Sequence, residues 1–273
     1  KPDENTLYRI ASMTKSFAAA AIVHLRDAGK LRLDDAISTW VPEFEQLVYP
    51  STDSNDITIR DLLTMSAGWP QDDPWADRQL YRDDFSITQL YREGVTFSNP
   101  PGITYEYSNY AYFILGRIIS AACAEPAMDY IERVFLKPLG MTSTTWRPEL
   151  GANDNHAQGY RFEDGTWKEE AALPNGGDLA AFAGLYCTIS DLARWVGMFL
   201  CAWPPRDSPE DAPLRRSSAR EMQQSARQLE PCLEDRHVAA APSIRASAYG
   251  FGLSCTHNGR WQRVGHGGGL PGF

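Results

Sequence analysis

Residues 12–25 decide the fold, and their sequence is Ser12-Met13-Thr14-Lys15-Ser16-Phe17-Ala18-Ala19-Ala20-Ala21-Ile22-Val23-His24-Leu25. Alanine and leucine are strong helix formers, and the stretch stays apolar on nearly every side until Arg26. Gly29 follows at the position where a glycine commonly ends a helix. The pattern therefore predicts a helix that is buried at the centre of the protein.

Ser12 and Lys15 lie three residues apart at the start of this helix, so their side chains share one face. A serine at a helix N-terminus lies beside unpaired N–H groups, which can stabilise an oxyanion on a substrate carbonyl. Burial should lower the pKa of a lysine, and the neutral amine can then accept the serine proton. The pattern predicts a serine nucleophile with a lysine base. The alternative is a helix-capping serine beside a surface lysine.

A second motif, Tyr107-Ser108-Asn109, follows the turn at Pro101-Gly102 and precedes a predicted apolar helix over residues 110–123. A phenol beside a lysine ammonium is easier to deprotonate and can pass a proton to a leaving group. An asparagine offers both a donor and an acceptor to a substrate amide. The alternative is an aromatic helix start in which Ser108 or Asn109 serves only as the cap.

The third motif, His266-Gly267-Gly268-Gly269, follows two predicted strands over residues 249–255 and 261–264, which an Asn-Gly turn joins. Small residues let a substrate backbone approach closely and expose N–H groups. The spacing Gly267-x-Gly269-x-x-Gly272 also matches a dinucleotide fingerprint, but no helix follows it. An α/β-hydrolase oxyanion loop is also excluded, because the chain has no G-x-S-x-G nucleophile elbow.

The composition of the 273 residues is that of a globular protein with ample core, and the net charge of −9 argues against nucleic-acid and anionic-membrane partners. No apolar run reaches the roughly 20 residues that span a bilayer. The histidines are scattered and no C-x-x-C pair occurs, so no metal site is expected. The odd number of cysteines favours mostly buried thiols over a disulfide framework: Cys123, Cys187, Cys201, Cys232 and Cys255.

Taken in this order, the three motifs resemble those of the serine β-lactamase and penicillin-binding-protein superfamily, and in detail its class C branch, the β-lactamase-related or S12 peptidases. Segments along nearly the whole chain support the resemblance, among them residues 62–68, 137–141, 183–186 and 249–252. It implies an α+β fold of the β-lactamase/transpeptidase type, with an antiparallel sheet flanked by helices. Residues 1–34 and 236–273 would form the α/β part of one catalytic unit, and residues 35–235 a mostly helical part.

The resemblance also implies roles for the motif residues. Ser12 resembles the acylated nucleophile, and Lys15 and Tyr107 resemble the pair that shares general-base and general-acid work. Asn109 resembles the residue that orients Lys15 and a substrate amide. The backbone N–H groups of Ser12 and Gly269 would form the oxyanion hole.

His266, Gly267 and Gly268 stand where a β-lactamase has Lys-Thr-Gly, so the lysine and threonine that would hold a substrate carboxylate are replaced. Esterases, D-amino-acid peptidases and acyltransferases of the family therefore resemble this pattern better than true β-lactamases. The expected function is hydrolysis of an ester or amide through a Ser12 acyl-enzyme, without a cofactor. The rival is a non-catalytic relative that binds peptides or peptidoglycan or serves as a scaffold.

Only 11 residues precede Ser12 and none follows Phe273, whereas the family builds sheet strands from both flanks. An incomplete sheet would leave unpaired strand edges. We therefore expect a chain that is truncated at both ends, with a second chain or a further segment completing the sheet. The compartment stays open between the bacterial periplasm and the cytoplasm.

Overall fold

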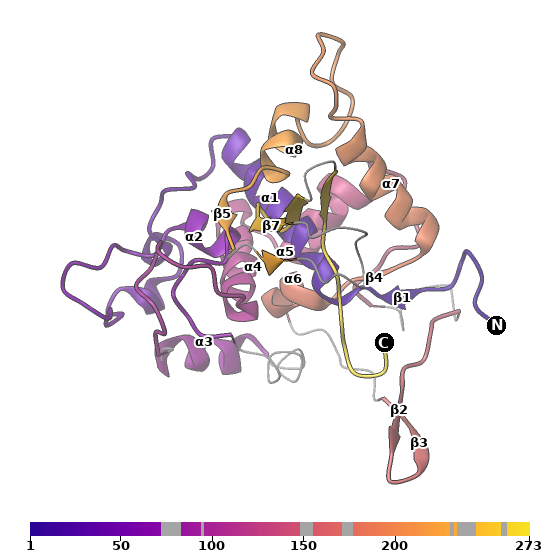
Figure 1. The fold of residues 1–273 in the computed structure, drawn as a ribbon, viewed down its shortest axis with the longest axis horizontal. Helices are drawn as coiled ribbons and strands as arrows, with labels where there is room; N and C mark the ends of the chain where they lie inside the picture. The colour runs from indigo at the N-terminus through magenta and orange to yellow at the C-terminus, as the bar shows by residue number, and fades with distance from the viewer. Residues whose placement is uncertain are drawn as a thin grey trace.

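The computed structural model describes residues 1–71, 83–93, 96–147, 155–170, 177–229, 232–233, 244–257 and 261–273. Helix α1 (Lys15–Asp27) lies at the centre of the molecule, and the short turn η1 (Ala11–Thr14) leads into it (Figure 1). All side chains from Phe17 to Val23 are fully buried. The helix ends at Asp27, and Gly29, two residues beyond it, has a φ of +70°. The predicted central helix and its glycine end are thus confirmed.

Helices surround α1, and the ones in contact with it include α4 (Asn109–Cys123), α5 (Ala127–Ile131), α6 (Ala180–Ala183) and α8 (Arg216–Met222). The longest of these, α4, presents a nearly continuous apolar surface from Tyr110 to Ile119 to this core. Further helices lie outside this group: η2 (Ile37–Thr39), η3 (Pro42–Phe44), α2 (Ile59–Leu63), α3 (Asp84–Glu93), η5 (Glu132–Leu136), η7 (Gly177–Leu179) and α7 (Ile189–Leu200).

The main sheet is antiparallel, with the order β5 (Arg227–Gln228), β7 (Ile244–Tyr249), β8 (Ser254–His257) and β9 (Gln262–Gly265), and β6 (Cys232–Leu233) pairs with β7. Strand β1 (Tyr8–Arg9) pairs with β4 (Tyr186–Cys187) beside the start of η1. Strands β2 (Tyr160–Glu163) and β3 (Thr166–Glu169) form a hairpin that projects from the body (Figure 1).

The single strand predicted over residues 249–255 is wrong, because β7 ends at Tyr249 and β8 begins at Ser254. The turn between them contains Gly252 at a φ of +68°. A Cβ atom on Gly252 would lie 2.8 Å from the Lys15 carbonyl oxygen, so only glycine lets this turn pack directly on α1. The predicted Asn258-Gly259 turn lies outside the described residues.

The four cysteines with described side chains are free thiols, and the expectation of burial holds for Cys187 and Cys255. Cys123 is half-buried, whereas Cys201 is exposed at the end of α7, contrary to that expectation. None of the helices in the described ranges is long and apolar enough to cross a membrane.

Candidate active site

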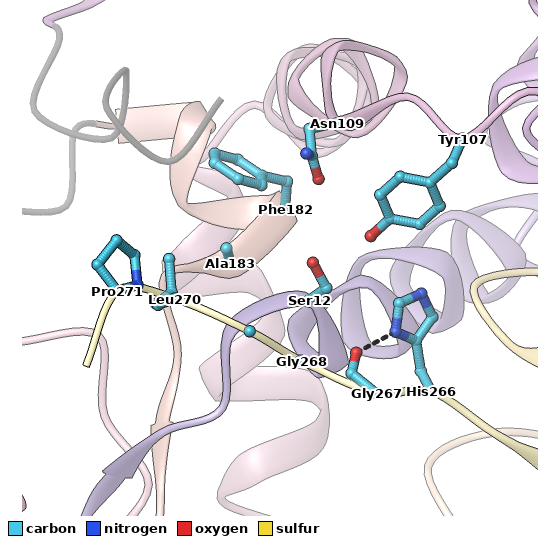
Figure 2. A pocket seen from close by; sticks show the side chains of 11 residues that line it. Ser12, Tyr107, Asn109, Phe182, Ala183, His266, Gly267, Gly268, Leu270 and Pro271 are labelled. Carbon is cyan, nitrogen blue, oxygen red and sulfur yellow. Dashed lines mark hydrogen bonds between the residues drawn. The ribbon is translucent and has the colours of Figure 1, made fainter. Parts of the chain in front are cut away.

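Ser12 opens onto a cavity of about 670 Å³ at the junction of the helices and the main sheet (Figure 2). The residue before it, Ala11, has a φ of +48°, a left-handed conformation that is uncommon for a residue with a side chain. The described residues that line the cavity are Ser12, Tyr107, Asn109, Phe182, Ala183, His266, Gly267, Gly268, Gly269, Leu270 and Pro271. All three predicted motifs therefore meet at this cavity, although they lie some 95 to 254 residues apart in the chain.

Lys15 is fully buried, so the alternative of a surface lysine is wrong. Its Nζ donates to Asn109 Oδ1 at 2.6 Å, to the Phe182 carbonyl at 3.1 Å and to Ser12 Oγ at 2.9 Å. The amide and carbonyl oxygens can only accept, so they take two hydrogens of the amine. The third position on Nζ faces the Ser12 hydroxyl, which can accept a hydrogen from an ammonium or donate its own to a neutral amine.

Three aromatic rings surround the Lys15 amine. Its Nζ lies 5.1 Å from the ring centroid of Tyr107, 5.6 Å from that of Tyr112 and 5.2 Å from that of Phe182. The faces of such rings attract a cation. The rings therefore favour the charged amine, and burial favours the neutral one.

The segment that enters α4 supplies Tyr107 and Asn109. Ser108 caps the helix, because its hydroxyl accepts from the Ala111 N–H at 3.3 Å, and Asn109 is left to bind Lys15. Figure 2 shows the Tyr107 hydroxyl and the Asn109 amide directed toward the space above Ser12 Oγ. The alternative in which this motif only caps a helix therefore accounts for Ser108 and leaves its two neighbours for the site.

His266 follows the end of β9 and is half-buried beside Tyr107, with 6.1 Å between the ring centroids. Its Nδ1 contacts the Gly267 carbonyl oxygen, and its Nε2 lies 2.9 Å from the Tyr249 hydroxyl. Burial, together with the positive charge of Lys15, lowers the pKa of His266 to about 4. The ring is therefore neutral at pH 7.

The glycines after His266 run past η1 and bring their backbone to the cavity beneath Ser12 (Figure 2). A Cβ atom on Gly268 would lie 2.2 Å from the Ile10 carbonyl oxygen, so a side chain there would collide with the segment that leads to Ser12. Gly269 has no atom within 4 Å of its Cβ position and lies open to the cavity. The close passage at Gly268 fixes the position of this loop relative to the serine.

Two contacts of the site were not predicted from the sequence. The Phe182 carbonyl is a main-chain group, which no residue type marks in a sequence. Tyr249 belongs to a segment that supported the family resemblance, yet its bond to His266 depends on the turn between β7 and β8. Within the described ranges, no group of three or more histidine, cysteine, aspartate or glutamate residues could hold a metal ion.

The sequence model of the family described as Beta-lactamase matches residues 1–273. The chain belongs to the Beta-lactamase family. This confirms the family resemblance that the three motifs carry.

Among the curated relatives, protein flp of Staphylococcus aureus is 33% identical over 198 residues, which are 72% of this chain and 39% of that protein. A putative D-alanyl-D-alanine carboxypeptidase of Escherichia coli is 29% identical over 218 residues, with 71% of this chain and 50% of that protein covered. This Beta-lactamase family chain therefore spans half or less of the length of these relatives.

Solved structures share its fold. An octameric penicillin-binding protein homologue from Pyrococcus abyssi superposes with a TM-score of 0.76 at 24% identity, over 97% of this chain and 57% of that one. The D-amino acid amidase of Ochrobactrum anthropi gives a TM-score of 0.69 at 23% identity, over 99% and 72%. These matches confirm the predicted β-lactamase/transpeptidase-type fold.

Proposed function

We propose that this Beta-lactamase family chain is the catalytic part of a serine esterase or amidase that works through an acyl-enzyme on Ser12. The observation that carries the proposal is the coordination of Lys15. Asn109 Oδ1 and the Phe182 carbonyl oxygen, which can only accept, take two hydrogens of its amine, and the Ser12 hydroxyl lies 2.9 Å from the same nitrogen. A neutral Lys15 bonded in this way directs its lone pair at the nucleophile.

Acylation would begin when Ser12 Oγ attacks the substrate carbonyl carbon while its proton passes to Lys15 Nζ. The negative charge on the carbonyl oxygen would be stabilised by the backbone N–H groups of Ser12 and Gly269. As the bond from the carbonyl carbon to the leaving group breaks, the Tyr107 hydroxyl would donate its proton to that group. Lys15 would then reprotonate Tyr107, so that no net proton is gained or lost.

Deacylation would repeat these steps with water as the nucleophile. A water molecule would attack the acyl carbon, its proton would pass to the Tyr107 and Lys15 pair, and Ser12 Oγ would leave and recover a proton. Asn109 would hold the amine in place in both halves of the cycle through its 2.6 Å bond and would also meet a substrate amide. None of these steps requires a cofactor.

The proposed preference for open-chain esters and amides over β-lactams, which carry a carboxylate, rests on the loop after β9. A neutral His266 and the bare backbone of Gly267 and Gly268 offer neither an ammonium nor a hydroxyl to a carboxylate. The D-amino acid amidase named above acts on amides by its name, and this chain shares its fold. An ester or amide bond, including one next to a D-residue, is therefore the proposed target.

The organisation of the catalytic unit also remains a proposal. Residues 1–34 and 236–273 would form its α/β part and residues 35–235 its mostly helical part. In the described ranges β9 pairs with β8 alone. A further segment or a second chain would pair with its other edge, which otherwise exposes unpaired backbone groups.

The first experiment is intact-protein mass spectrometry after exposure of the full-length protein to a fluorophosphonate. One covalent adduct is expected, and it should vanish in Ser12→Ala but persist in Ser190→Ala, a matched loss of an exposed hydroxyl on α7. An unreactive, folded wild-type protein would contradict the hydrolase proposal and favour the binding or scaffold role.

A further inference from the structure

Both nitrogens of the His266 ring are already engaged by the protein. The Gly267 carbonyl oxygen can only accept, so the Nδ1 that contacts it carries the hydrogen. In a neutral imidazole with Nδ1–H, Nε2 is an acceptor. The Tyr249 hydroxyl, 2.9 Å away, therefore donates to Nε2. His266 consequently has no N–H left to offer to a substrate.

Tyr249 is held firmly in the position that this bond requires. Its side chain is 1% exposed, and its ring meets that of His266 edge to face at 5.8 Å. The ring of Tyr105 packs against it with 5.7 Å between centroids. A hydroxyl on a buried, packed ring cannot follow the imidazole if the imidazole turns, so the bond fixes the orientation of His266 as well as its tautomer.

The other described residues of the cavity wall are also uncharged. No lysine, arginine, aspartate or glutamate occurs among the described residues that line it. The nearby Lys15 is fully buried and is not among the described lining residues, and its amine contacts Ser12 Oγ, Asn109 Oδ1 and the Phe182 carbonyl. A substrate carboxylate or ammonium in the cavity would meet no opposite charge among these residues.

We propose that Tyr249 is a positioning residue that keeps both nitrogens of His266 engaged, and that the site therefore selects uncharged esters and amides over acyl donors with a carboxylate or an ammonium group beside the scissile bond. This inference rests on the proposed hydrolase function and narrows its substrates. Free amino-acid amides should also be poor substrates, because their α-ammonium group would meet no carboxylate on the described wall.

Three aryl acetates with the same scissile bond test the selectivity: 3-acetoxybenzamide, 3-acetoxybenzoate and 3-acetoxybenzylammonium. With kcat/KM normalised to the rate of each ester with hydroxide, the benzamide should exceed each charged ester by about tenfold or more. Tyr249→Phe should bring the benzoate within about threefold of the benzamide, because the freed ring can turn and offer an N–H to the carboxylate. Tyr105→Phe removes a hydroxyl from the neighbouring ring and should preserve the wild-type ratio.

The positioning role has its own readout, which does not depend on turnover. In full-length protein labelled with ¹⁵N-histidine, the His266 signals, assigned by their loss in His266→Gln, should show a protonated Nδ1 and a hydrogen-bonded, unprotonated Nε2. Tyr249→Phe should shift the Nε2 signal, and Tyr105→Phe should not. An Nε2–H tautomer, or an Nε2 signal unchanged in Tyr249→Phe, overturns the positioning role even where Ser12 reacts with the fluorophosphonate.

Equal normalised kcat/KM values for the three esters overturn the selectivity while leaving the hydrolase proposal standing. Loss of all ester turnover, together with a Ser12 that does not react, counts against the hydrolase proposal and the selectivity. The nitrogen signals then decide the role of Tyr249 by themselves.

Discussion

The two sides of the cavity are built in different ways. On the helical side, the first residues of α1 and α4 bring Lys15 and Asn109 into a buried, hydrogen-bonded group with the Phe182 carbonyl. On the sheet side, the chain after β9 contributes one neutral ring and a run of backbone, much of it exposed. The helical side thus holds groups that can move protons, whereas the sheet side supplies shape and main-chain donors. Substitutions on the helical side should therefore slow proton transfer, whereas substitutions on the sheet side should lower stability.

The largest effect is expected on the helical side, from Lys15→Met. Methionine keeps most of the apolar stem but has no amine to take the Ser12 proton. The rate of fluorophosphonate labelling at Ser12 should fall by about 10²- to 10⁴-fold, the usual contribution of a general base. The measurement is the labelling rate by intact mass under conditions where circular dichroism shows a folded protein.

Lys30→Met is the matched control, because Lys30 is exposed just beyond the end of α1. It makes the same chemical change at an exposed lysine beyond the far end of α1 and should label at the wild-type rate. Labelling of Lys15→Met at a rate close to that of Lys30→Met would show that the buried amine is a structural group and not a base.

On the sheet side, the expected failure is one of stability and not of proton transfer. Gly268→Ala would place a Cβ atom 2.2 Å from the Ile10 carbonyl oxygen, whereas Gly269→Ala meets no atom within 4 Å. We expect Gly268→Ala to lower the free energy of unfolding by about 3 kcal/mol, the cost of overpacking against backbone. Gly269→Ala should stay within about 0.5 kcal/mol of the wild type. Urea unfolding midpoints measure both.

Similar midpoints for the two alanine variants would mean that the loop moves freely relative to η1. In that case the oxyanion hole proposed at Ser12 and Gly269 would lose its structural basis, since the contact at Gly268 is what fixes the distance between those two residues.

The same contrast explains what the sequence could and could not predict. Ser12, Lys15, Tyr107 and Asn109 were chosen because short spacings at helix starts imply a chemistry, and the structure brings them to one cavity. These spacings are informative because the geometry of a helix start sets the directions of its own side chains without help from tertiary contacts.

Contacts that depend on tertiary structure were missed. The bond from Tyr249 to His266 depends on the turn between β7 and β8, where the sequence pattern predicts one continuous strand. The sequence signal for this turn is the pair Gly250 and Gly252 on either side of Phe251, since Gly252 adopts a positive φ. Nothing in the sequence marks the Phe182 carbonyl, because every residue has one.

The smallest expected effect is a pH dependence of the unfolding free energy that comes from His266, on the sheet side of the cavity. The pKa of His266 is about 4 in the folded protein against 6.5 for the ordinary ring, so between these values the unfolded chain binds a proton that the folded protein does not. Stability should therefore fall as the pH drops from about 6.5 to about 4. Over this range a half-buried ring should account for about 2 kcal/mol.

His266→Gln should lose that part of the pH dependence, whereas His257→Gln, at an exposed position on β8, should keep it. His24 also has a lowered pKa because it is buried, but both variants retain it, so its contribution cancels between them. Unfolding free energies at pH 4.5 and 7.5 supply the comparison. If His266→Gln and the wild type lose equal stability on acidification, His266 gains its proton as readily in the folded protein as in the unfolded chain. The sheet side of the cavity would then carry a positive charge in mild acid, and its proposed neutrality would fail there.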